Sequence, residues 1–85
     1  MAQVKLFANL RKIAGQKELF ITGATLNFVL NGLVQQVPAL ESVILENGQI
    51  RPQIIITLNG QNTTDPNVAV TEEDTIAIFP PISGG

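Results

Sequence analysis

The end of the chain carries the residues with the clearest chemical implication. The last six residues are Pro80-Pro81-Ile82-Ser83-Gly84-Gly85. Because glycine makes up about 7% of average sequence, two glycines in the final positions arise by chance in roughly one chain in 200. Prolines direct the chain away from the body, and glycines fit through a narrow channel in another protein. We therefore expect the carboxylate of Gly85 to be a reactive group that partner proteins bind, rather than part of a frayed terminus.

Two missing residue types restrict the other chemistry open to the chain. The sequence has no cysteine and no histidine, which removes thiolate metal sites, disulfides, cysteine nucleophiles and the commonest general base. The acidic run Glu72-Glu73-Asp74 is a candidate metal or acid–base site, but three adjacent acids in a turn are usually solvated. We predict no metal site and no enzymatic activity, since no convergent catalytic set is present.

Composition and charge limit the class of protein. The chain has 85 residues, of which 45% are hydrophobic and 14% charged, and this predicts one globular domain. A net charge of -2 without a basic stripe argues against a nucleic-acid partner. No stretch approaches the roughly 20 apolar residues of a membrane span, and no signal-peptide pattern is visible, so we expect a cytoplasmic protein without a membrane partner. Arg11-Lys12 is interpreted as surface charge, with contact to a partner or a phosphate left open.

Alternating residues predict the strands that must position the tail. The expected strands are Ala2–Ala8, Lys17–Thr22, Gln53–Leu58 and about Thr75–Phe79. The first two are joined by a loop over residues 9–16, in which Gly15 supplies the turn. Asn-Gly pairs mark turns at residues 47–48 and 59–60. Residues 39–46 are predicted as a short helix or an irregular crossing, and residues 61–66 as loop.

One amphipathic helix is predicted between these strands. Thr25 serves as its cap, and it ends near Val37 because Pro38 disfavours continuation. Its apolar residues form one stripe that covers a sheet, and Gly32 weakens its middle by about 1 kcal/mol relative to alanine. The order of elements predicts an α+β fold in which one main helix lies across a mixed sheet.

The same alternation places three apolar residues on the sheet face away from the helix. These residues are Phe7, Ile55 and Phe79. Exposed apolar residues are ordinary when single, but three together near the root of the tail form a patch of the kind that binds partners. We predict a docking face there, with surface scatter as the alternative.

The ending resembles a known family. Residues 79–85, Phe79-Pro80-Pro81-Ile82-Ser83-Gly84-Gly85, are similar to the end of the molybdopterin synthase small subunit, in the MoaD/ThiS group of ubiquitin-like sulfur carriers. Leu6-Phe7-Ala8 with Leu10-Arg11 and Gly15 resembles the first strand and loop of that family, and Leu58-Asn59-Gly60 its central turn. The resemblance extends over essentially the whole chain. It implies a ubiquitin-like β-grasp domain over residues 1–79 and a flexible di-glycine tail over residues 80–85.

Three departures bear on how much of the family's biology applies. Lys12 stands where the family often has an acid, and Glu72-Glu73-Asp74 replaces its usual Asp-Gly-Asp corner. Residues 47–52, Asn47-Gly48-Gln49-Ile50-Arg51-Pro52, resemble a longer subgroup whose members are not all committed to molybdopterin. The resemblance therefore specifies the carrier role more firmly than the pathway.

The resemblance also implies a mechanism and its partners. A ubiquitin-activating-like adenylyltransferase would use ATP to adenylate Gly85, and a sulfur donor would convert it to a thiocarboxylate, a C-terminal 1-thioglycine. The tail residues Pro80, Pro81, Ile82, Ser83 and Gly84 would enter the partner. Sulfur would pass to a pterin precursor in the large subunit of molybdopterin synthase, which holds the substrate pocket, and the chain would bind no cofactor of its own. Sulfur delivery for cysteine, methionine or thiamine synthesis, protein modification, and a plain interaction domain remain as alternatives.

Overall fold

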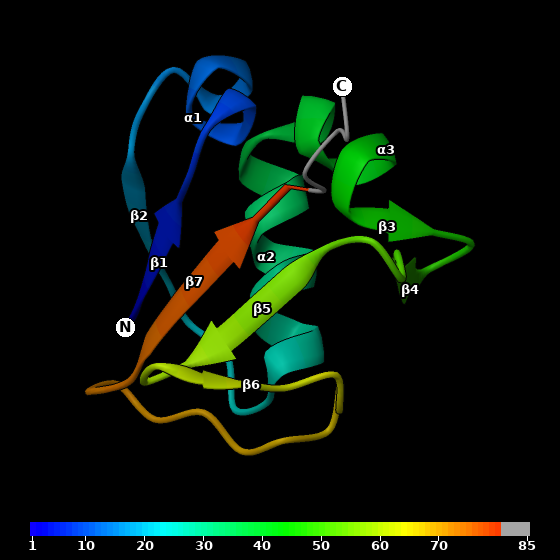
Figure 1. Ribbon diagram of the computed structural model, residues 1–85. Helices are drawn as coiled ribbons and strands as arrows, with labels where there is room; N and C mark the ends of the chain where they lie inside the picture. The colour runs from blue at the N-terminus through cyan, green and yellow to red at the C-terminus, as the bar shows by residue number, and fades with distance from the viewer. Residues whose placement is uncertain (81–85) are drawn as a thin grey trace.

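A five-stranded mixed sheet forms the centre of the computed structural model, which describes residues 1–80 (Figure 1). Its strands are β1 (Ala2–Leu6), β2 (Glu18–Ile21), β5 (Ile55–Leu58), β6 (Gln61–Asn62) and β7 (Thr75–Phe79), in the order β2-β1-β7-β5-β6. Strands β1 and β7 run parallel, and the other neighbours are antiparallel. The N-terminal and last strands therefore lie side by side at the centre, and the predicted mixed sheet is confirmed.

Helix α2 (Leu26–Gln36) packs across one face of this sheet. As predicted, the hydroxyl of Thr25 caps it by accepting a hydrogen bond of 3.3 Å from the backbone N–H of Phe28, and Val37 follows its last turn. A Cβ atom on Gly32 would lie 2.8 Å from Cγ2 of Ile21. The glycine that weakens the helix therefore allows it to approach strand β2 closely.

The hydrophobic core lies between α2 and the inner face of the sheet. Alternate strand residues supply one side of it, and the helix supplies the other. The fully buried members of the core are Val4, Leu6, Leu10, Leu26, Val29, Leu30, Leu33, Leu40, Ile44, Ile76 and Ile78. Because this face is closed by α2, the opposite face of the sheet is the one that can meet other molecules.

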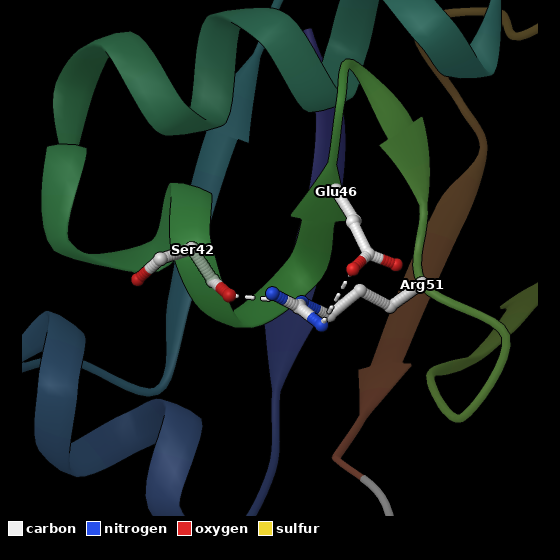
Figure 2. A network of polar contacts seen from close by, with 3 residues as sticks. All are labelled: Ser42, Glu46 and Arg51. Carbon is white, nitrogen blue, oxygen red and sulfur yellow. Dashed lines mark hydrogen bonds and ion pairs between the residues drawn. The ribbon is translucent and has the colours of Figure 1, made fainter.

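The chain between α2 and β5 forms a short crossing and a hairpin. It contains the 3-10 helix η1 (Pro38–Leu40), helix α3 (Glu41–Ile44) and the paired strands β3 (Leu45–Glu46) and β4 (Gln49–Ile50). The predicted turn is confirmed, with φ angles of 54° at Asn47 and 78° at Gly48. Arg51 holds the unit together, since its Nε donates to the carbonyl of Ser42 at 2.9 Å and its guanidinium lies 3.8 Å from the carboxylate of Glu46 (Figure 2).

The prediction of loops over residues 9–16 and 61–66 is wrong in part. Helix α1 (Asn9–Ala14) occupies most of the first, and Gly15 ends it with a φ of 74°. This helix has six residues, and only Leu10 is buried. A single buried residue gives no apolar periodicity from which a helix could be predicted. Strand β6 has two exposed residues and exists because the Asn59-Gly60 turn folds it back onto β5.

Four strand ends also differ from the prediction, and two of them belong to β2, which covers Glu18–Ile21 instead of Lys17–Thr22. Strand β1 stops at Leu6 instead of Ala8, because Ala8 has a φ of 53° that no strand contains. Strand β5 begins at Ile55 instead of Gln53.

Candidate functional site

Phe7 and Phe79 form a stacked pair at one end of the sheet's outer face. The parallel register of β1 and β7 pairs Leu6 with Ile78. Phe7 and Phe79 directly follow these two residues and therefore lie side by side. The ring centroids are 4.4 Å apart and the ring planes differ by 16°. Both side chains are half-buried. The stack fixes the end of β7, where the chain leaves the sheet toward its C-terminus.

Ile55 extends this pair across the sheet. The antiparallel register of β5 and β7 places Ile55 opposite Phe79, and Ile55 is 42% exposed. Phe79 on β7, Ile55 on β5 and Phe7, directly after the end of β1, therefore form one line, which we call the outer apolar row. The prediction that these three residues share a face is confirmed.

The outer apolar row is confined to one end of the sheet. The next line of outward-facing residues across the same strands is Lys5, Ala77 and Thr57. Beyond it, Gln3 pairs with Thr75. Exposed apolar surface on these three strands is thus concentrated at the end of β7, which is the position expected of a surface that acts together with the tail.

Arg11, predicted as surface charge with contact to a partner or a phosphate left open, lies beside the stack of Phe7 and Phe79. Its Nε donates to the carbonyl of Leu6 at 2.9 Å, and its guanidinium carbon lies 5.3 Å from the centre of the Phe7 ring. That distance is within the range of a cation–π interaction. Helix α1 brings Arg11 there because the chain reverses at Ala8, whose φ of 53° and ψ of -130° are rare for an L-residue. The sequence signal for this contact was a cation four residues after Phe7. That spacing indicates a contact only when helix α1 is known to turn the chain back at this point.

The tail itself is only partly described. Pro80 is half-buried and is the last residue that the structure describes. The other predicted site residues, Pro81, Ile82, Ser83, Gly84 and Gly85, lie outside the described residues. Their roles remain predictions from the sequence.

The acidic run before β7 has a structural role through Asp74. Its carboxylate accepts hydrogen bonds from Nδ2 of Asn59 at 2.9 Å and from the backbone N–H of Thr71 at 2.8 Å. These bonds, that from Asn59 first, hold the pKa of Asp74 below its ordinary value. Glu72 and Glu73 are exposed as predicted. Among residues 1–80, no group of three acids, histidines or cysteines is placed to hold a metal ion.

No helix within residues 1–80 has both the length and the apolar content needed to cross a membrane.

Comparison with known proteins identifies the family. The family model described as the ThiS family matches residues 4–85. The molybdopterin synthase sulfur carrier subunit of Arabidopsis thaliana is 36% identical, and the alignment covers 98% of this chain and 81% of that protein. Small archaeal modifier protein 3 of Haloferax volcanii is 27% identical, with 98% of this chain and 97% of that protein covered.

Comparison with a solved structure identifies the fold. The solution structure of small archaeal modifier protein 1 from Methanosarcina acetivorans superposes with a TM-score of 0.89 at 38% identity, covering 99% of this chain and 95% of that chain. The mixed sheet under one main helix is thus a ubiquitin-like β-grasp fold. The chain belongs to the ThiS family, a group of ubiquitin-like sulfur carriers of the MoaD/ThiS type.

Proposed function

We propose that the chain carries sulfur on the carboxyl group of Gly85 and delivers it in molybdopterin biosynthesis. The observation that carries this proposal is the extent of the family match, which runs from Val4 to Gly85 and so includes the terminal glycine pair. A match confined to the β-grasp domain would support the fold without the chemistry. The absence of cysteine agrees with it, because the chain cannot hold sulfur as a persulfide.

The proposed chemistry begins with activation of an unreactive carboxylate. In the active site of an adenylyltransferase, an oxygen of the Gly85 carboxylate attacks the α-phosphorus of ATP and pyrophosphate leaves. A sulfur donor then attacks the acyl carbon, AMP leaves, and the product is a thiocarboxylate. The thiocarboxylate is anionic near neutral pH and is a better nucleophile than the carboxylate, as sulfur nucleophiles are.

The tail residues serve access in this proposal. Gly84 is required because a Cβ atom beside the reacting carboxyl group would collide with a channel shaped for backbone alone. The fixed φ of the two prolines, Pro80 and Pro81, would stiffen the start of the segment that enters the partner, and Ser83 has no such requirement for a missing side chain. The outer apolar row provides the docking surface next to the tail, since aromatic residues are enriched in protein interfaces.

The assignment to molybdopterin is supported by the 36% identical relative named as the sulfur carrier subunit of molybdopterin synthase. In that role the tail enters the large subunit of the synthase and transfers sulfur to a pterin precursor. A second candidate function, covalent modification of proteins through Gly85, is supported by relatives named as small archaeal modifier proteins. Both functions start from the same acyl-adenylate.

Intact-mass spectrometry of the chain purified from its native cell tests the proposal. We expect a species in which one terminal oxygen is replaced by sulfur, and we expect it to disappear when the adenylyltransferase gene is deleted. A variant with one leucine appended after Gly85 is the control, because it keeps the domain and removes the reactive terminus. A terminus that is never converted, in a cell that uses the chain, would refute the carrier role.

Reconstitution distinguishes the two candidate functions. The thiocarboxylated chain is mixed with the large synthase subunit and a pterin precursor, or with lysine-bearing cell proteins and the adenylyltransferase. Loss of sulfur from Gly85 with formation of a dithiolene supports the molybdopterin role. Formation of amide bonds between Gly85 and lysine side chains supports modification.

A further inference from the structure

The positive charge of the chain is concentrated in one segment. Four of the five basic residues, Lys5, Arg11, Lys12 and Lys17, fall between residues 5 and 17. All seven acids lie outside this segment, and Glu18, directly after it, is the nearest. A chain with a net charge of -2 therefore has a basic region on a mainly acidic surface.

Three of these cations surround a hollow beside Phe7. The hollow has a volume of about 200 Å³ and is lined by Lys5, Leu6, Phe7, Arg11, Lys17 and Glu18. A hydrogen bond of 2.9 Å from the N–H of Leu6 to the carbonyl of Lys17 brings its two sides together. We call it the basic hollow.

The cations of the basic hollow have no anionic partner among the residues that the structure describes. The two ion pairs within residues 1–80 join Met1 to Glu72 and Arg51 to Glu46. Glu18 lines the hollow, but its carboxylate accepts a hydrogen bond of 2.7 Å from Nε2 of Gln3 and forms no ion pair there. Three positive charges against one negative charge leave the hollow with a net charge of +2.

Arg11 is held in a position that suits recognition of a carboxylate. Its Nε is occupied by the carbonyl of Leu6, and its guanidinium carbon lies over the Phe7 ring, 5.3 Å from the ring centre. Within residues 1–80, its terminal nitrogens make no hydrogen bond, so they are available as a pair of donors. A pre-oriented guanidinium loses little entropy when it binds a carboxylate, which is why arginine serves such sites.

The stack of Phe7 on Phe79 links the basic hollow to the tail. Arg11 lies over Phe7, Phe7 stacks on Phe79 at 4.4 Å, and Phe79 is the last residue of β7. A partner that engages the hollow is therefore aligned with the point from which the tail departs. Each fate considered above for Gly85 begins with adenylation, so the encounter that needs this alignment first is that with the adenylating enzyme.

We propose that the basic hollow binds an acidic side chain, an aspartate or glutamate, of the adenylating partner, and that this contact aligns the tail for activation. The inference rests on the proposed function and adds a charged contact to the apolar docking surface. Charge complementarity of this kind raises the rate and selectivity of association and depends on salt. The chemical step at Gly85 needs no part of it.

Two variants with the same change in charge test the inference. Lys17→Glu reverses a charge that lines the hollow, whereas Lys12→Glu reverses a charge on α1 that does not. The measurement is ATP–pyrophosphate exchange by the adenylyltransferase of the same cell, as a function of the concentration of the chain. Thermal unfolding confirms that each variant is folded, and Lys17→Gln provides a milder change at the same position.

We expect Lys17→Glu to raise the KM for the chain by about tenfold at low salt, with kcat unchanged, while Lys12→Glu stays within about twofold of the wild type. The difference shrinks in about 1 M salt, where the Debye length is about 3 Å. Equal KM values for the two variants, beside normal exchange with the wild type, overturn the inference and leave the carrier function intact. Absence of exchange with the wild type overturns both.

Discussion

The two ends of strand β7 are held in different ways. At its start, Asn59, Thr71, Asp74 and Thr75 bond to one another, with Nδ2 of Asn59 donating to Asp74 and Oδ1 of Asn59 accepting from the N–H of Thr75 at 2.9 Å. At its end, Phe79 stacks on Phe7 and Arg11 lies over that ring. The first arrangement uses polar groups, and the second uses half-buried rings with cations beside them.

The difference separates a structural site from an interaction site. The side-chain oxygens and amide of the first arrangement have partners within the domain, so a protein partner would gain little by binding there. The second leaves exposed apolar area and positive charge that gain contacts when another protein covers them. Changes at the start of β7 should therefore reduce stability alone, and changes at its end should reduce both stability and binding.

Replacing Phe79 should have the largest effect. We expect Phe79→Ala to lower the free energy of unfolding by about 2–3 kcal/mol, below the roughly 3–5 kcal/mol for a fully buried ring, because Phe79 is only half-buried. The loss includes the stacking with Phe7, which is worth about 0.5–1.5 kcal/mol. Urea denaturation measures the stability, and the KM for adenylation should rise as well.

Phe20→Ala is the matched control for this change. Phe20 is 53% exposed on strand β2 and pairs with Gln3, away from the outer apolar row. Its loss should change stability by less than about 0.5 kcal/mol and leave the KM unchanged. If Phe20→Ala weakened partner binding as much as Phe79→Ala, the outer apolar row would not be the docking surface.

A change at the start of β7 should have a smaller effect, confined to stability. We expect Asn59→Ala to cost about 2 kcal/mol, since two side-chain hydrogen bonds are worth about 0.5–1.5 kcal/mol each and the φ of 53° disfavours alanine. Asn59→Gly keeps this φ accessible and should recover part of the loss. Chemical denaturation gives both values, and an altered KM for adenylation in either folded variant would contradict the separation of roles.

Much of the fold could be predicted because its signals are local. The spacing of apolar residues from Leu26 to Val37 identified α2, and the Asn-Gly pairs identified both turns, whose positive φ angles the structure contains. Strand parity placed Phe7, Ile55 and Phe79 on one face. The alternation of side chains predicted this face correctly because α2 covers one face of the sheet and leaves the face of these three residues uncovered.

The roles of Arg11 and Asp74 could not be predicted because they depend on distant residues. Asp74 meets Asn59 across 15 residues of chain, and only the pairing of β5 with β7 brings them together. Arg11 reaches Phe7 because a short helix follows Ala8, and no residue pattern indicates the unusual backbone conformation of Ala8. Sequence alone therefore placed the apolar residues of the site on one face, but left a contact of Arg11 only as an alternative to surface charge.

The smallest expected effect is a loss of stability in acid, caused by protonation of Asp74 at the start of β7. Hydrogen bonds from Asn59 and Thr71 lower the pKa of Asp74 in the folded chain below the ordinary 3.8, so the folded state favours the ionised carboxylate. The stabilisation is then fully present above the ordinary pKa and is lost as the pH falls through the lowered one.

We expect Asp74→Asn to be less stable than the wild type at neutral pH and the difference to narrow in acid. Glu73→Gln is the control, because it removes one negative charge and keeps Asp74. Its stability should still fall with acid as that of the wild type does, when unfolding curves are recorded between about pH 5 and pH 2. A difference between the wild type and Asp74→Asn that stays constant over this range would show that the Asp74 carboxylate does not stabilise the fold through its charge.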